Sequence, residues 1–315
     1  MKILITGGCG YKGSVLIPRL LNEGHKIINL DTQWFGDNLD EHPNLENIKI
    51  DIRDLSNFKL TGIDSVIHLA NVANDPAVDL NPNLSWEINV LAGYQLIDKA
   101  IREGVKQFIY ASSGSVYGVK KEKKVHEDLE LVPVSVYNKT KMIAERVLLS
   151  YKKSIDVICV RPATVCGVSP RMRLDVSVNM LTYQALRHKN IKVFGGKQFR
   201  PSIHVKDLTN LYLFFFKKIP SGCYNAGFEN ISILDIAKKI KVHVPCKIKI
   251  YKSNDVRSYR LDSSKIIKLG FKPKFGVEDA IKEIIEIYKN KKFRAKDINY
   301  TVKWMLKKKF QINKN

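Results

Sequence analysis

Hydrophobic and polar residues follow two different periods in the first half of the chain. Short runs rich in β-branched residues alternate with longer segments in which apolar residues recur every three or four positions. This alternation is typical of βαβ units, whose strands pair in parallel within one sheet. The pattern predicts strands over residues 2–6, 26–30, 47–50, 65–68, 106–110 and 156–160, and helices over 14–23, 84–103 and 136–151.

The pattern loosens after Arg161, where helices are predicted over residues 178–186, 233–240 and 277–288. A chain of 315 residues is long enough for one large α/β core and a smaller lobe. We predict an α/β fold, with a doubly wound parallel (Rossmann) sheet and a smaller C-terminal α/β substrate lobe. The expected divisions are a Rossmann domain over 1–168, with 206–230 packing back on it, a lobe from 169–205 and 231–290, and a basic tail over 291–315.

The formal net charge of +22 is unusually high, but it is spread along the chain, mostly as lysine. Because the charge is not clustered, we expect no nucleic-acid partner. The densest region is the tail after Lys289, which includes Lys307, Lys308 and Lys309. We interpret this tail as a solvated basic helix or a frayed end. Docking to a polyanion or to a membrane surface is the alternative.

The five cysteines are odd in number and lack paired C-x-x-C spacing, so we expect a reducing compartment and no metal site. The sequence shows no secretory signal at Met1. The longest apolar run, over residues 211–216, is too short to span a bilayer. The chain is therefore expected to be cytoplasmic.

Gly7, Gly10 and Gly13 follow the first predicted strand and open the first helix. Without side chains, such a loop lets backbone N–H groups approach a pyrophosphate at the positive end of the helix. Asp31 ends the second strand about 20 residues later, where a carboxylate binds both ribose hydroxyls and repels a 2′-phosphate. We predict a site for NAD rather than NADP. A turn that needs glycine for backbone reasons is the alternative.

Tyr137 and Lys141 lie four residues apart in a predicted helix and project from one face. Oxidation of an alcohol needs a base, and an ammonium beside a phenol lowers the phenol's pKa from its ordinary value near ~10. The spacing alone is common in helices. Ser113 adds weight, because it lies at the carboxyl end of a predicted parallel strand, where open α/β sheets bind ligands.

The G-x-x-G-x-x-G spacing, Ser113 and the Tyr137/Lys141 pair together resemble the extended branch of the short-chain dehydrogenase/reductase superfamily, namely its nucleotide-sugar epimerases, dehydratases and dehydrogenases. The resemblance covers residues 1–288. It implies that Ser113 orients a sugar hydroxyl, that Tyr137 is the acid/base, and that Lys141 binds the nicotinamide ribose and lowers the tyrosine pKa. Ser112 is the alternative to Ser113.

The resemblance also implies the residues that contact NAD. Lys12 departs from the family pattern, which usually has an apolar residue there, and its ammonium either contacts the pyrophosphate or extends to solvent. Asn89 either contacts the cofactor region or bonds the backbone at a helix start. The predicted NAD residues are Gly7, Gly10, Tyr11, Lys12, Gly13, Asp31, Asp51, Ile52, Leu69, Ala70, Asn71, Asn89, Ser112, Tyr137, Lys141 and Pro162.

A nucleoside diphosphate needs cationic partners, and the planar guanidinium of arginine suits phosphate oxygens. Arg200, Arg257 and Asn179 match family positions on the phosphate side, with Arg171 and Arg173 as further candidates. The predicted substrate residues are therefore Ser113, Ser115, Arg171, Arg173, Asn179, Arg200 and Arg257.

Family dehydratases carry an Asp-Glu pair directly after the orienting hydroxyl, because elimination needs a second acid and base. Gly114 and Ser115 occupy those positions here, which disfavours a 4,6-dehydratase. The remaining expectation is oxidation of a ring hydroxyl, at C4, giving either a released 4-keto sugar or a 4-epimer. A non-catalytic NAD-binding sensor is the competing class.

The Lys-rich composition resembles that of proteins from AT-rich bacteria that make surface polysaccharide, which suggests a GDP-linked mannose-series hexose or heptose as substrate. The family resemblance also implies a homodimer formed through the helices predicted over 84–103 and 136–151.

Overall fold

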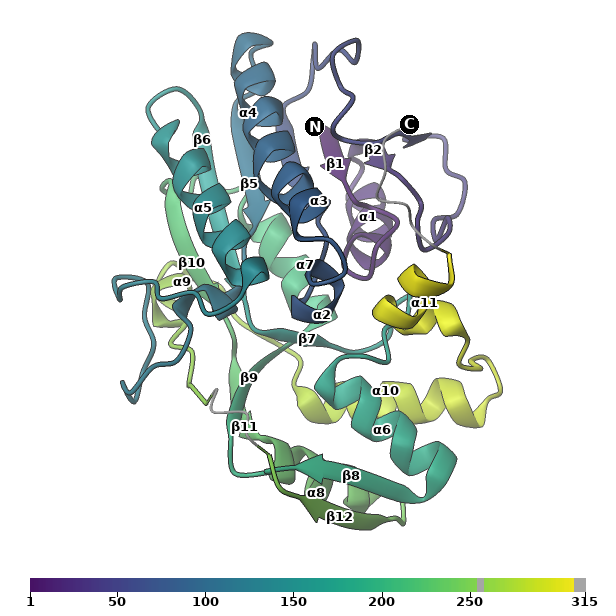
Figure 1. Cartoon of the computed structure of the whole chain (residues 1–315). Helices are drawn as coiled ribbons and strands as arrows, with labels where there is room; N and C mark the ends of the chain where they lie inside the picture. The colour runs from purple at the N-terminus through teal and green to yellow at the C-terminus, as the bar shows by residue number, and fades with distance from the viewer. Residues whose placement is uncertain (254–257, 309–315) are drawn as a thin grey trace.

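The main sheet of this computed structural model has seven parallel strands and brings the ends of βαβ units to one edge (Figure 1). The structure describes residues 1–253 and 258–308. The strand order is β3-β2-β1-β4-β5-β6-β10, and each pair is parallel. The strands are β1 (Lys2–Thr6), β2 (Lys26–Asp31), β3 (Leu45–Lys49), β4 (Ser65–His68), β5 (Gln107–Ala111), β6 (Asp156–Pro162) and β10 (Gly222–Ala226). The predicted Rossmann fold is confirmed.

Alternate side chains of these strands enter two separate hydrophobic layers, as a sheet covered on both faces requires. Ile3 and Ile5 pack with α1 (Gly13–Asn22) and α7 (Val205–Phe214). Leu4 packs on the opposite face, where α2 (Asp75–Val78), α3 (Pro82–Trp86), α4 (Ala92–Arg102) and α5 (Val136–Ser150) lie. Segment 206–230 rejoins the main sheet, because it carries α7 and then β10, which pairs with β6.

The smaller lobe combines helices with two short sheets below the main sheet (Figure 1). Its elements are β7 (Thr164–Cys166), α6 (Ser177–His188), β8 (Asn190–Phe194), β9 (Phe199–His204), β11 (Glu229–Ser232), α8 (Ile233–His243), β12 (Lys247–Tyr251) and α10 (Val277–Lys289). Helix α9 (Ser264–Lys268), which the sequence assigned to the lobe, packs instead beside β10, and its Ile266 joins the core of the main sheet. β9 lies between β7 and β11, and β8 pairs with β12.

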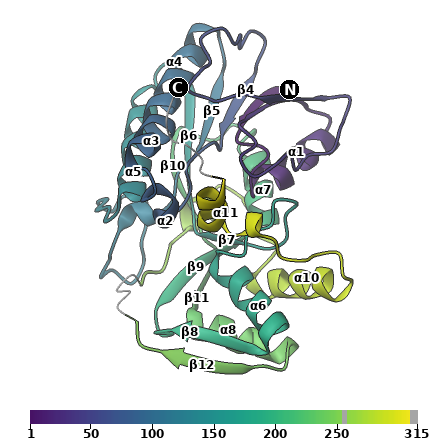
Figure 2. The same ribbon diagram turned by 45° about the vertical axis from the view of Figure 1, so that its right-hand side comes forward.

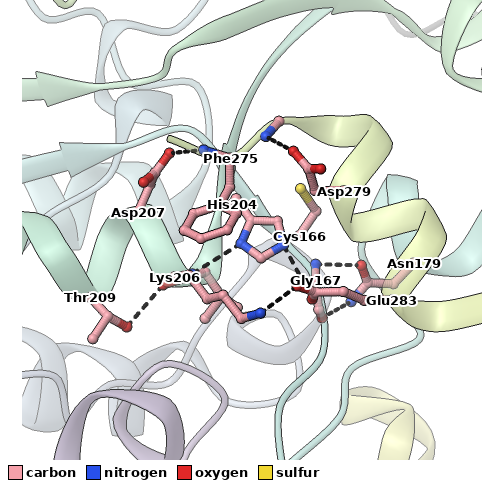
Figure 3. A network of polar contacts seen from close by, with 12 residues as sticks. Cys166, Gly167, Asn179, His204, Lys206, Asp207, Thr209, Phe275, Asp279 and Glu283 are labelled. Atoms are coloured by element: carbon pink, nitrogen blue, oxygen red, sulfur yellow. Dashed lines mark hydrogen bonds and ion pairs between the residues drawn. The ribbon is translucent and has the colours of Figure 1, made fainter. Parts of the chain in front are cut away.

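Polar contacts fasten the lobe to α7 and the strand before it (Figure 3). Glu283 of α10 lies 3.3 Å from the buried His204 imidazole and 2.6 Å from Lys206 Nζ. The Asp207 carboxylate accepts hydrogen bonds from the backbone N–H groups of Lys274 and Phe275. These contacts fix the lobe over the carboxyl edge of the main sheet.

The helix predicted over 84–103 is interrupted. A π-helical turn over Glu87–Leu91 separates α3 from α4, and it carries the buried Asn89. The amide Nδ2 of Asn89 donates to the Val72 carbonyl at 3.2 Å and to Thr140 Oγ1 at 3.1 Å. π-turns of this kind are frequent near functional sites.

The interpretation of the C-terminal segment as a solvated or frayed tail is wrong for its first part. A 3₁₀ turn over Asp297–Asn299 and helix α11 (Thr301–Lys307) pack against the rest of the protein, with Thr301 and Met305 both 4% exposed. Apolar and small residues at these positions bury one side of the short helix, whereas its lysines face outward. Residues 309–315 lie outside the described residues. Within the described part of the chain, no helix has the length and hydropathy needed to cross a bilayer.

Candidate active site

A cavity opens at the carboxyl edge of the main sheet and reaches from the glycine loop to the start of α5. At Gly7, φ is +76°, and a Cβ there would stand 2.6 Å from the backbone nitrogen of Ala70. A Cβ at Gly13 would stand 2.4 Å from the Cα of Gly8. Side chains are thus excluded where the loop turns into α1, and the helix start is open to an anionic ligand.

Asp31 forms part of the cavity wall at the end of β2. Its carboxylate accepts hydrogen bonds from the backbone N–H of Cys9 at 2.9 Å and of Gln33 at 2.7 Å. Burial raises the pKa of this carboxyl, while the two backbone hydrogen bonds act in the opposite direction. The contacts fix the carboxylate at the position where the sequence predicts a ribose partner.

Four cationic side chains contribute to the same cavity: Lys12, Lys141, Arg171 and Arg173. Burial and the charge of Arg173 lower the pKa of Lys12 to about 8. Burial and Arg173 also lower the pKa of Arg171 to about 9. Arg173 itself donates to Asp175 Oδ1 at 2.8 Å. Such a concentration of positive charge favours an anionic occupant. Of the two alternatives for Lys12, its place in the wall favours a phosphate contact over extension into solvent.

Tyr137 lies at the inner end of the cavity, in the first turn of α5. Burial raises the pKa of its phenol to about 12, and the hydrogen bond with Ser113 opposes that rise. The Ser113 and Ser115 hydroxyls lie 2.8 Å apart. The carboxyl end of β5 and the start of α5 therefore bring Ser113, Ser115 and Tyr137 together, as a hydroxyl-orienting site requires.

Lys141 is 3% exposed and follows Tyr137 by one helical turn. Its Nζ donates to the Ala111 carbonyl at 2.6 Å and lies 4.8 Å from the centre of the Tyr110 ring. With the Asn71 amide oxygen turned toward it, Nζ also donates to that oxygen at 3.0 Å. Burial, reinforced by the charge of Lys12, holds the pKa of Lys141 well below its usual value.

The other residues predicted to contact NAD fall into two groups. Gly10, Tyr11, Asp51, Ile52, Leu69, Ala70 and Asn71 line the cavity. Asn89, Ser112 and Pro162 are not part of its wall. Asn89 instead braces the loop after β4, accepting from Val72 N at 2.9 Å. The buried Ser112 hydroxyl makes no hydrogen bond within the described residues, so the contact with Tyr137 favours Ser113 as the orienting hydroxyl.

Residues 3–227 match the model of the NAD dependent epimerase/dehydratase family. The chain belongs to this family. A UDP-glucose 4-epimerase from Lactobacillus helveticus is 27% identical over 313 residues, covering 89% of this chain and 95% of that protein. The UDP-glucuronic acid 4-epimerase of Bacillus cereus, solved with UDP-glucuronic acid and NAD, is 27% identical with a TM-score of 0.79, covering 92% of this chain and 99% of that one. MoeE5, solved with the same two ligands, is 26% identical with a TM-score of 0.82, covering 92% and 100% of the two chains.

Like the rest of this family, the protein uses NAD as its cofactor. Its own residues fit that dinucleotide, because the glycine cradle has no room for a Cβ, a fixed carboxylate stands at the end of β2, and cations line the wall between them.

The residues predicted to hold the substrate are distributed differently from the expectation. Arg171 and Arg173 line the cavity of the glycine loop, which we assign to the cofactor and not to the sugar nucleotide. Asn179 is fully buried, and Figure 3 shows its amide facing Gly167. It accepts from Gly167 N at 3.0 Å and donates to the Tyr11 hydroxyl at 3.0 Å. A phosphate contact by Asn179 is not supported, because its amide is already bonded to protein groups.

Two predicted arginines remain on the substrate side. Arg200 lies in β9, and its Nη1 donates to the Phe199 carbonyl at 3.2 Å. Arg257 lies outside the described residues. A second cavity, separate from the one at the glycine loop, is lined in part by Lys123, Lys124 and Arg260. Leu261 borders this cavity and also lies beside Gly114, so the two cavities approach each other near the hydroxyl cluster.

Sequence reasoning missed several residues of the wall. Cys9, Trp34, Phe35, Thr301 and Met305 all line the cofactor cavity. Trp34 and Phe35 follow Asp31 closely, so their nearness could have been inferred. Thr301 and Met305 come from the far end of the chain, and no motif marks them. Tyr259, which lies near Gly114 and raises the pKa of Tyr137, was missed for the same reason.

Proposed function

We propose that this protein is an NAD-dependent 4-epimerase of a nucleotide-diphospho-sugar. The observation that carries the proposal is the position of Tyr137, which lies in the wall of the cavity that also contains the glycine loop and interacts with Ser113. Lys141, buried one turn along the same helix, completes the group of side chains that oxidation of an alcohol needs.

In this proposal Ser113 and Ser115 bind the C4 hydroxyl and hold it against Tyr137, whose phenolate oxygen accepts its proton. When bound, NAD supplies the hydride acceptor. Burial raises the pKa of Tyr137 in the structure. We assign to Lys141, which is held by the Ala111 carbonyl and by Asn71, the role of favouring the phenolate form through its charge. Return of the proton from Tyr137, after the sugar has presented its other face, restores the resting side chains.

Two observations favour epimerisation over the other reactions of the family. A Cβ at Gly114 would stand 3.3 Å from the Pro162 carbonyl oxygen, so this position is closely packed, and neither Gly114 nor Ser115 supplies the acid and base of a dehydratase. Both Lactobacillus helveticus and Bacillus cereus relatives are named as 4-epimerases. Net dehydrogenation with release of a 4-keto sugar is the second candidate. A sensor would not need the intact Ser113, Tyr137 and Lys141 set.

We propose that the nucleoside diphosphate occupies the cavity lined by Lys123, Lys124 and Arg260, with Arg200 and Arg257 as further phosphate partners. Relatives with UDP-sugar names favour uridine as the base. The composition favours a GDP-linked mannose-series hexose or heptose, for use in surface polysaccharide. UDP- and GDP-linked sugars are therefore separate arms of the test.

The test is mass spectrometry of the products formed from UDP-glucose, UDP-glucuronic acid and GDP-mannose, with the Tyr137→Phe protein as the blank. An epimer keeps the mass of its substrate and is separated from it by chromatography. A ketone that has lost two hydrogens would identify a net dehydrogenase instead. A product that has lost water would contradict the proposal.

We also propose a homodimer in which α4 and α5 of two copies pack together. Leu91 and Tyr94 are 50% and 41% exposed on this side of the protein. Light scattering of the purified protein should give twice the mass of one chain, and the variant Leu91→Lys should shift it toward the monomer. A monomeric parent protein would refute this arrangement.

A further inference from the structure

The C-terminal helix α11 forms part of the wall of the cofactor cavity. Thr301 and Met305 line it from one side, while the glycine loop and Asp31 line it from another. In both views α11 lies between α2 and the loop that follows β2, above the lobe helices α6 and α10 (Figures 1 and 2). The chain thus returns to its own cofactor cavity almost 300 residues after the glycine loop, at Thr301.

Contacts tie α11 to the Rossmann half. Trp304 Nε1 donates to the Trp34 carbonyl at 2.7 Å, in the loop after Asp31. Met305 is packed in the hydrophobic layer that contains Val72 and Val78. The helix is therefore tied to the loop after β2 by Trp304, and it packs against α2 and the hydrophobic layer of that face through Met305.

Other contacts tie the same segment to the lobe. Thr301 N donates to Asp175 Oδ2 at 3.1 Å, and the Asn299 amide donates to the Met172 carbonyl at 3.0 Å. The Leu174 N–H donates to the Asn299 carbonyl at 2.9 Å. These hydrogen bonds fasten α11 to the segment that carries Arg171 and Arg173.

Arg171 connects α11 to the place in the cavity where a ligand would bind. It is 5% exposed, its Nη2 donates to Thr301 Oγ1 at 3.2 Å, and its guanidinium lies 4.0 Å from the centre of the Phe35 ring. Among the described residues, no acidic side chain forms an ion pair with it. A buried guanidinium held by a hydroxyl and an aromatic ring, and lining a cavity, is prepared for an anion.

We propose that α11 and Arg171 form a clasp that closes the cofactor site over the adenosine diphosphate half of NAD and slows its dissociation. The clasp consists of Arg171, Thr301, Trp304 and Met305. This inference rests on the proposed function, in which the same NAD molecule must take and return a hydride in each turnover. A seven-residue helix has little stability by itself, so the contacts on both sides are what keep the clasp formed.

The test measures the rate at which bound NADH leaves the full-length protein, by chasing its fluorescence with excess NAD⁺. Arg171→Met removes the charge, Thr301→Val removes the hydroxyl but keeps the shape, and Trp304→Phe removes the anchor to Trp34. Each should increase the dissociation rate, by about tenfold for Arg171→Met and by a smaller factor for the other two. Lys303→Ala, on the same helix, is the matched control: it loses an exposed ion pair with Asp297 of the preceding 3₁₀ turn and should change the rate less than about twofold.

Thermal unfolding of each variant without cofactor is measured in parallel. If all three variants lose stability but release NADH at the parent rate, α11 only joins the two halves of the protein and the clasp is refuted. Slow release that these variants accelerate, in a protein that converts none of the nucleotide sugars, would refute the proposed function and leave the clasp standing.

Discussion

The two cavities that approach each other near Gly114 are built differently. On the cofactor side, Arg171 and Lys141 are buried and Lys12 is partly buried, and the pKa of each is lowered by burial. On the substrate side, the cations Lys123, Lys124 and Arg260 are exposed. Buried charges are costly until an anion joins them, whereas exposed charges cost little and attract any anion weakly.

In the proposed function, this difference separates a resident ligand on the cofactor side from an exchanging ligand on the substrate side. The cofactor side gains most from an occupant that stays, and helix α11 forms part of its wall. The substrate side suits a sugar nucleotide that enters and leaves in every cycle. An enzyme with one retained and one exchanging ligand is suited to recycling its hydride, which is the property that separates an epimerase from a net dehydrogenase.

The largest expected effect is at the junction of the two cavities. Tyr137→Phe removes the acid/base, and kcat should fall by about 10³ or more, with NAD content unchanged. Tyr212→Phe is the matched control, because this tyrosine is also buried, with no hydrogen bond to its hydroxyl among the described residues. Steady-state kinetics with quantified NAD would contradict the assignment if both variants kept the parent kcat.

The next largest effect is expected on NAD affinity, and it tests the cofactor side alone. Gly7→Ala places a Cβ against the backbone of Ala70 and requires a left-handed conformation, at a cost of about 1–3 kcal/mol. NAD affinity should fall by at least about tenfold. Gly62→Ala, at φ +78° with no atom near the added Cβ, is the matched control for backbone strain. Equal NAD affinity in the two variants, measured by calorimetry, would show that the glycine loop does not bind the dinucleotide.

Lys12→Met should have opposite effects on stability and on binding. Because the pKa of Lys12 is lowered to about 8 in the folded protein from the usual 10.5, its charge destabilises the NAD-free fold below pH 8, and this penalty disappears as the pH rises toward 10.5. At neutral pH the variant should be more stable in urea without NAD, yet bind NAD more weakly. A stability gain that persists unchanged at the alkaline end would exclude buried charge as its cause.

The smallest effect is expected on the exposed side. The double variant Lys123→Ala and Lys124→Ala should raise the KM for the sugar nucleotide by a few fold at low salt and by less at high salt, with kcat and NAD retention unchanged. A lower NAD content in this variant would contradict the separation of the two cavities.

The sequence predicted the elements in which the pattern of apolar and polar residues follows burial directly. Central strands of the main sheet such as β1, β4 and β5 are mostly buried, and glycines mark the cofactor loop by position alone. The seventh strand, β10, was not predicted, because the chain reaches it only after a long excursion through the lobe. β8 and β12 were not predicted. In these two paired strands lysine alternates with Ile or Val, whereas most of the predicted strands are runs of buried residues. The role of α11 was also beyond the sequence. Lysines dominate the composition of this segment and favour a solvated helix. The position of Thr301 and Met305 in the cavity wall depends on how the chain folds back, which no sequence motif indicates.

The most direct test of hydride recycling uses a UDP-sugar carrying deuterium at C4, incubated with the purified protein and its bound NAD but with no added cofactor. Mass spectrometry and NMR should show an epimer that has kept its deuterium at C4, with no reduced cofactor free in solution. A ketone that has lost deuterium, together with labelled NADH released into solution, would contradict the account.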